Sequence, residues 1–111
     1  MTSKQRFECV REMGTYTDRD AFVSDLALSS LWGDAEDAEI PPERIAELGE
    51  LWDAAHRSIK EIAASAGMSN RQLSERFCIS YRTVENWSAG DREPPVWVLL
   101  MMQECLGKNG N

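Results

Sequence analysis

The sequence predicts an all-α protein, a helical bundle whose N-terminal part is acidic. Two observations lead to this fold class. Apolar residues recur at spacings of three and four, the period of an amphipathic helix, and no stretch alternates as a half-buried strand does. Glycines also follow the stretches with helical spacing, where a left-handed residue commonly ends a helix. We expect this role at Gly14, Gly33, Gly67, Gly90 and Gly107.

The N-terminal part is expected to hold two helices and an acidic connector. The first helix covers residues 4–13, and the second covers residues 17–32 with Thr17 as its N-cap. One face of the first helix gathers its apolar residues, Phe7, Val10 and Met13. The connector of residues 33–39 carries four carboxylates that we expect to be solvated. They are Asp34, Glu36, Asp37 and Glu39.

A long amphipathic helix is expected from Pro42, since proline suits a first helical turn, to about Ala66. Its apolar residues recur at helical spacing and form one stripe. They are Ile45, Leu48, Trp52, Ala55, Ile59, Ile62 and Ala66. A second interpretation stays open, because Ser58 and Glu61 have the spacing of a capping box. That box would start a new helix and leave a break near His56.

The last helix, residues 94–106, is apolar on nearly every side. A lone surface helix would have a polar face, so this one must be covered by the N-terminal helices or by a second copy. We therefore expect a homodimer. Its apolar run, residues 96–102, is too short to span a bilayer. The predicted organisation is an acidic N-terminal segment over residues 1–41, a second helical domain over residues 42–107 and a flexible tail over residues 108–111.

The net charge of −7 is distributed unevenly along the chain. Residues 1–57 carry six Lys and Arg against thirteen Asp and Glu, whereas residues 58–111 carry six of each. Nucleic-acid-binding domains are usually basic, but a neutral one still binds DNA when its basic side chains share one face. The acidic part is, in turn, a candidate surface for a protein partner.

The remaining composition argues against an enzyme and against a secreted or membrane protein. Cys9, Cys78 and Cys105 are odd in number and widely spaced, which is typical of reduced thiols in a cytoplasmic protein. No basic segment followed by an apolar stretch marks a signal peptide. His56 lacks Cys or His partners at ligand spacing, so we expect no metal and no cofactor. No nucleophile or phosphate-loop motif is present.

The most informative stretch is residues 68–90, which predicts two short capped helices. Ser69 would cap the first, with Gln72 closing a capping box, and Ser80 would cap the second. Only three residues, centred on Cys78, are left for the turn, so the helices must cross steeply.

The second of these helices is predicted to have a core side with Val84 and Trp87. Its opposite side carries long polar side chains near the helix N-terminus, the place from which a recognition helix contacts base edges. They are Tyr81, Arg82, Glu85 and Asn86. The helix N-termini at Ser69 and Ser80 can receive phosphates through free backbone N–H groups.

At these residues the chain resembles the lambda-repressor-like helix-turn-helix family of the Cro and XRE type. The resemblance covers residues 59–106. It includes Leu73 in the first short helix, Ser80 and Thr83 at the start of the second, and the closing run Gly90-Asp91-Arg92-Glu93-Pro94. Cys78 stands where the family usually has glycine, so we expect a left-handed backbone there. Asn70 stands where the family commonly has a phosphate-binding glutamine.

The resemblance implies a regulator of transcription that binds double-stranded DNA sequence-specifically, as a repressor or autoregulator of a mobile-element or toxin–antitoxin operon. It implies DNA contacts from Asn70, Tyr81, Arg82 and Asn86, with Arg92 beside the backbone. The alternative is a protein–protein interaction adaptor on the same scaffold. Pattern and resemblance together give the candidate DNA-binding residues. They are Ser69, Asn70, Arg71, Ser80, Tyr81, Arg82, Thr83, Glu85, Asn86 and Arg92.

Overall fold

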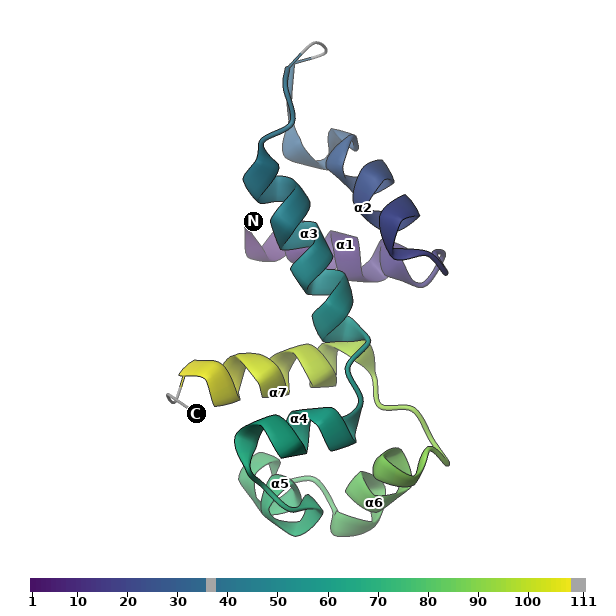
Figure 1. Cartoon of the computed structure of the whole chain (residues 1–111), viewed down its shortest axis with the longest axis vertical. Helices are drawn as coiled ribbons and strands as arrows, with labels where there is room; N and C mark the ends of the chain where they lie inside the picture. Colours follow the sequence, from purple (N-terminus) through teal and green to yellow (C-terminus); the bar gives the residue numbers. More distant parts are fainter. Residues whose placement is uncertain (36–37, 109–111) are drawn as a thin grey trace. The chain divides into compact units, whose positions relative to one another are not determined.

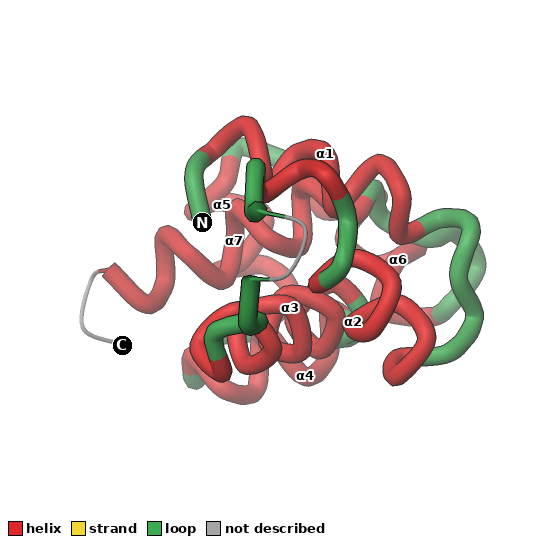
Figure 2. Tube along the Cα trace, turned by 90° about the horizontal axis from the view of Figure 1, so that it is seen from above, coloured by secondary structure: helices red, strands yellow, loops and turns green. Residues whose placement is uncertain are grey.

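The structure is a computed structural model that describes residues 1–35 and 38–108. Every regular element in this part of the chain is helical (Figures 1 and 2), which confirms the predicted all-α class. The elements are α1 (Ser3–Met13), α2 (Arg19–Ala27), the short 3₁₀ helix η1 (Ser30–Trp32), α3 (Pro42–Ala55), α4 (Ile59–Ala66), α5 (Asn70–Phe77), α6 (Tyr81–Ala89) and α7 (Val96–Lys108). Within the described residues, no helix combines the length and apolar character needed to cross a membrane.

The chain forms two compact units, residues 1–53 and residues 54–111, which are described separately. The predicted division into residues 1–41, 42–107 and 108–111 was based on expected function and not on packing, so it stays a prediction. Lys108 is the last residue of α7, and the rest of the expected tail lies outside the described residues.

The core of the first unit forms around Phe22, which is fully buried on α2. Its ring lies 5.2 Å from the ring of Trp52 on α3 and 5.6 Å from that of Tyr16. Cys9 and Met13 supply the buried face of α1, and burial raises the pKa of the Cys9 thiol. The prediction that Phe7 shares this face is wrong, because its side chain is 68% exposed.

Two predicted helix boundaries in this unit are also wrong. Asp18, not Thr17, caps α2, since its carboxylate accepts the Ala21 N–H at 2.9 Å. The helix ends at Ala27 instead of continuing to residue 32, and η1 follows after Ser29. The indole of Trp32 then donates to the Leu26 carbonyl at 2.7 Å, which holds the turn against the end of α2.

The described carboxylates of the acidic connector, Asp34 and Glu39, are both exposed as expected. Asp34 is also paired with Arg44, with 3.0 Å between Oδ1 and Nη2. The hydrogen bonds from Arg44 lower the pKa of Asp34. Glu36 and Asp37 lie outside the described residues.

The continuous helix predicted from Pro42 to Ala66 is wrong, and the alternative break near His56 is confirmed. Here α3 ends at Ala55 and α4 begins at Ile59. Ser58 caps α4 with the complete box, because its hydroxyl accepts the Glu61 N–H and the Glu61 carboxylate accepts the Ser58 N–H, both at 3.1 Å.

Three of the five expected left-handed glycines are confirmed, with φ values of 67° at Gly33, 65° at Gly67 and 83° at Gly90. The other two expectations are wrong. Gly14 has a right-handed φ of −61°, and Gly107 lies inside α7, which continues to Lys108.

The second unit has one apolar core, to which α4, α5, α6 and α7 all contribute. Helix α4 packs on both α6 and α7, and α5 packs on α6. The buried members of this core are Ile59, Ile62, Ala63, Leu73, Val84, Val98, Leu99, Met102 and Leu106. Helix α7 is apolar all round in sequence but not buried all round, since Trp97 is 59% exposed and Met101 is 39% exposed.

Candidate nucleic-acid interface

The candidate interface starts with α5, whose first turn is fixed by local hydrogen bonds. The Ser69 hydroxyl accepts the Gln72 N–H at 3.1 Å, and the Gln72 side chain accepts the Ser69 N–H at 2.8 Å. The predicted capping box is therefore confirmed. At the other end, Cys78 adopts φ 55° and ψ 39°, as expected, and its N–H donates to the Ser74 carbonyl.

The connection from α5 to α6 is the three residues Cys78, Ile79 and Ser80. The left-handed Cys78 reverses the chain, and the Ile79 N–H then donates to the Ser74 carbonyl at 3.0 Å. Ser80 caps α6, because its hydroxyl accepts the Thr83 N–H at 3.2 Å and also pairs with the Thr83 hydroxyl at 2.8 Å. Both α5 and α6 therefore begin with a first turn whose conformation is fixed by a serine cap.

One side of α6 packs into the core and the other faces solvent. Val84 is fully buried, and Trp87 packs against the same core while staying only half-buried. At about 100° per residue, Arg82 lies almost opposite the midpoint between these two side chains. Tyr81, Arg82 and Glu85 are exposed, in agreement with the prediction.

Asn86 is less available than the sequence indicates, since it is half-buried. Its backbone carbonyl ends the helix by accepting the N–H groups of Gly90, Asp91 and Arg92, the last two at 3.0 and 3.4 Å. These bonds turn the chain after Gly90 and place Arg92 in an exposed loop directly behind α6.

Several candidate side chains contact one another across the two helices. The Asn70 Nδ2 group donates to Glu85 Oε2 at 3.1 Å. The Glu85 carboxylate also raises the pKa of the Tyr81 hydroxyl. The guanidinium of Arg71 lies 4.2 Å from the centre of the Tyr81 ring, in the geometry of a cation–π contact.

These contacts are the part of the site that sequence reasoning missed. Asn70 and Glu85 are 15 residues apart, and no local spacing rule joins them. The available signal was the short turn, because a three-residue connection makes the two helices pack against each other.

The arginines of this region are free of acidic partners. Arg71, Arg76, Arg82 and Arg92 are all exposed, and none forms an ion pair with any described residue. In the first unit, by contrast, three arginines form ion pairs with carboxylates. They pair as Arg11 with Glu8, Arg19 with Asp53 and Arg44 with Asp34. Exposed arginines without an ion pair to a described residue thus occur on α5 and α6 and in the loop after α6.

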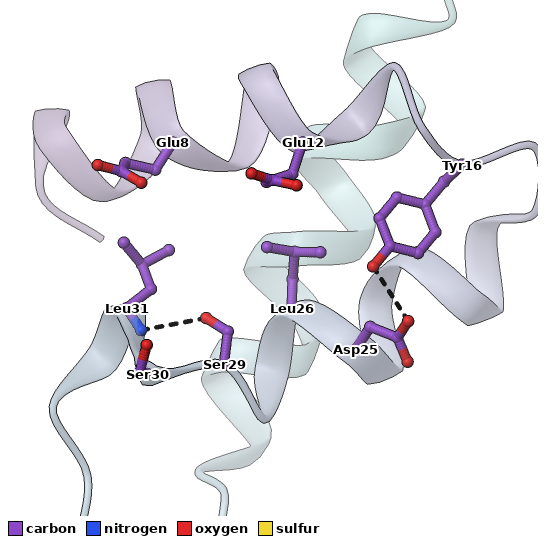
Figure 3. A pocket seen from close by; sticks show the side chains of 8 residues that line it. All are labelled: Glu8, Glu12, Tyr16, Asp25, Leu26, Ser29, Ser30 and Leu31. Atoms are coloured by element: carbon purple, nitrogen blue, oxygen red, sulfur yellow. Dashed lines mark hydrogen bonds between the residues drawn. The ribbon is translucent and has the colours of Figure 1, made fainter.

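The first unit contains a separate acidic pocket of about 270 Å³ between α1, α2 and η1 (Figure 3). Glu8 and Glu12 line the pocket from α1 and Asp25 lines it from α2, where the Tyr16 hydroxyl donates to Asp25 at 3.0 Å. That hydrogen bond raises the pKa of Tyr16. Among the described residues, no group of three His, Cys, Asp or Glu side chains is arranged to hold a metal ion.

Comparisons with other proteins add no family to these observations. No protein family, curated protein or solved structure matches the chain.

Proposed function

We propose that the protein is a regulator of transcription that binds double-stranded DNA sequence-specifically, with α5, Cys78–Ser80 and α6 acting as a helix-turn-helix of the lambda-repressor-like type. The observation that carries the proposal is the group of four exposed arginines without acidic partners on and behind these two helices. DNA binding depends on cations that neutralise phosphates, and intramolecular ion pairs would cancel that charge.

The face of α6 supports base reading. Arg82 lies in the first turn of α6, opposite the core residues Val84 and Trp87, which is where a recognition helix meets the major groove. Its guanidinium can bond guanine O6 and N7 together. Tyr81, Glu85 and Asn86 complete the reading face, and Asn86 contributes least because it is half-buried.

The ends of the two helices support phosphate binding. The Ser69 and Ser80 hydroxyls each occupy one backbone N–H of the first turn, so others remain for an anion at the positive end of the helix dipole. Arg71 and Thr83 lie in the same first turns. In this proposal Arg92, which is exposed in the loop after Gly90, contacts the DNA backbone.

The protein would act as a homodimer and as a repressor or autoregulator, without a cofactor and without enzymatic activity. Regulators of this type read two half-sites about one DNA turn apart, which requires two copies. The exposed Trp97 and Met101 are one helical turn apart on α7 and supply an apolar surface for the second copy.

The proposal is tested by comparing Arg82→Ala with Arg92→Ala on a duplex selected from random DNA. Losing the Arg82 base contact should cost about 1–3 kcal/mol and relax the preference at one base pair. Losing the Arg92 phosphate contact should weaken all duplexes alike and reduce the salt slope by about one unit. The measurement is a salt titration on the selected duplex and its single-base variants.

Lys4→Ala is the matched control, because it removes one exposed positive charge from α1 in the first unit. It should leave both the affinity and the salt slope nearly unchanged. A wild-type protein that selects no duplex over random DNA contradicts the proposal.

A second candidate, the protein–protein adaptor, is favoured by the acidic pocket of the first unit. Glu8, Glu12 and Asp25 line this pocket of about 270 Å³. Glu8 already pairs with Arg11, so Glu12 and Asp25 are the carboxylates suited to a lysine or arginine side chain of a partner. An arginine-rich peptide should bind in fluorescence anisotropy, and Glu12→Gln should weaken it. Glu43→Gln, an exposed carboxylate outside the pocket, should not. Equal effects of both changes would show that binding follows net charge alone.

A further inference from the structure

We propose that Glu85 is the residue that specifies a cytosine in the DNA site, and that Asn70 and Tyr81 hold its carboxylate in the reading position. The inference rests on the proposed function and assigns one base preference within it. The hydrogen bond that Glu85 on α6 accepts from Asn70 at the start of α5 carries it.

The geometry fixes a side chain that is otherwise free to rotate. Glu85 is exposed, yet its carboxylate accepts a hydrogen bond from Asn70 Nδ2 at 3.1 Å, and it raises the pKa of the Tyr81 hydroxyl one helical turn before it. A carboxylate has about four lone-pair directions, so the bond from Asn70 leaves acceptor positions free for a base. The fixed orientation means that little side-chain entropy is lost when a base binds.

A neighbouring positive charge reduces the electrostatic repulsion between the Glu85 carboxylate and the phosphates of DNA. Arg71 lies 4.2 Å from the centre of the Tyr81 ring, so a positive charge is held beside the Tyr81–Glu85 pair. It offsets part of the repulsion between Glu85 and phosphates. No ion pair with a described residue consumes the Arg71 charge.

The chemistry of an ionised carboxylate favours cytosine over the other bases. It is an acceptor only, and cytosine offers the N4 amino group as a donor in the major groove. Guanine presents N7 and O6 acceptors, and thymine presents O4, so both repel it. Adenine places its N7 acceptor beside the N6 donor, which matches the mixed donor and acceptor of an amide better than a carboxylate.

The test is a selection from random duplexes with wild-type protein and with Glu85→Gln. Wild-type protein should prefer cytosine at one position by about tenfold, and Glu85→Gln should change that preference to adenine, which glutamine bonds through N6 and N7. The matched control is Glu75→Gln, an exposed glutamate on α5. It removes the same charge and should keep the cytosine preference.

A measurement without DNA tests the positioning. Tyr16→Phe leaves Tyr81 as the only tyrosine in the chain, so its ionisation is read by ultraviolet absorbance. Adding Glu85→Gln should move the pKa of Tyr81 down towards its ordinary value, because the charged acceptor is gone. Tyr81→Phe should retain the cytosine preference at a reduced ratio.

Two results would overturn the inference while leaving the proposed function intact. The first is a selected duplex in which Glu85→Gln keeps the wild-type base at every position. The second is an unchanged pKa of Tyr81 in the Glu85→Gln protein. Wild-type protein without any preferred duplex overturns both the inference and the proposed function.

Discussion

Cys78 carries the backbone strain of the connection between α5 and α6. It is the one described non-glycine residue with positive φ, at 55°. A side chain in this conformation costs about 1–2 kcal/mol, because Cβ approaches the neighbouring carbonyl oxygen. The left-handed turn is nevertheless retained, since the Cys78 and Ile79 N–H groups both find the Ser74 carbonyl.

Replacing Cys78 with glycine should therefore stabilise the second unit, whereas Gly67→Ala should destabilise it. The two positions share one conformation, with φ 55° and 65°. A Cβ added at Gly67 meets nothing within 4 Å, so the backbone alone determines the cost. We expect changes of about 1 kcal/mol in opposite directions, measured by urea unfolding. A loss of stability on Cys78→Gly would show that the thiol contributes packing that outweighs the strain.

At the scale of the elements, α4 and α5 both begin with a capping box, but one box uses a charged side chain and the other a neutral one. The box of α4 uses the carboxylate of Glu61, whereas the box of α5 uses the neutral amide of Gln72. The hydrogen bonds from Ser58 lower the pKa of Glu61. A lowered pKa means that the stabilisation is present above the ordinary value of 4.5 and is lost as the pH falls through the folded-state value.

Glu61→Ala should consequently destabilise the protein at neutral pH and progressively less as the pH falls below about 4.5. Gln72→Ala should destabilise it to the same extent across that range, because an amide does not titrate. Thermal melts of both variants and the wild type between neutral and acidic pH make the comparison. Parallel pH profiles for the two variants would mean that the charge of Glu61 adds nothing to the box.

On the scale of the whole molecule, α7 is notable because part of its apolar surface is not covered by the second unit. Val98, Leu99, Met102 and Leu106 face the core, whereas Trp97 and Met101 remain exposed. Exposed apolar residues that cluster, unlike scattered ones, commonly mark an interface.

Sedimentation of the wild type should accordingly give a dimer at micromolar concentration, and Trp97→Ser should shift it to monomer without lowering helix content. Phe7→Ser is the control, because Phe7 is also an exposed aromatic residue, at 68%, but belongs to the first unit. A monomeric wild type, both free and on DNA, would contradict the homodimer. Dissociation by Phe7→Ser would place the contact on α1 instead.

The sequence by itself determined the local features of this protein. The caps at Ser69 and Ser80 and the left-handed Gly67 were predictable, and the cap at Ser58 was an open alternative to a continuous helix. Each satisfies backbone groups within a few residues of itself, so its cause lies inside the local pattern. The solvent side of α6 followed from the same reasoning, because Val84 fixes the phase of a regular helix.

Only the tertiary structure decided which side chains meet. Phe7 and Cys9 compete for the buried side of α1, and Trp87 is left half-buried although its position faces the core. Neither outcome follows from helical spacing, because it depends on the surface that the packed neighbour offers. The bond from Asn70 to Glu85 and the contact of Arg71 with Tyr81 have the same origin. They join residues far apart in sequence, and only the packing of α5 against α6 brings them within reach.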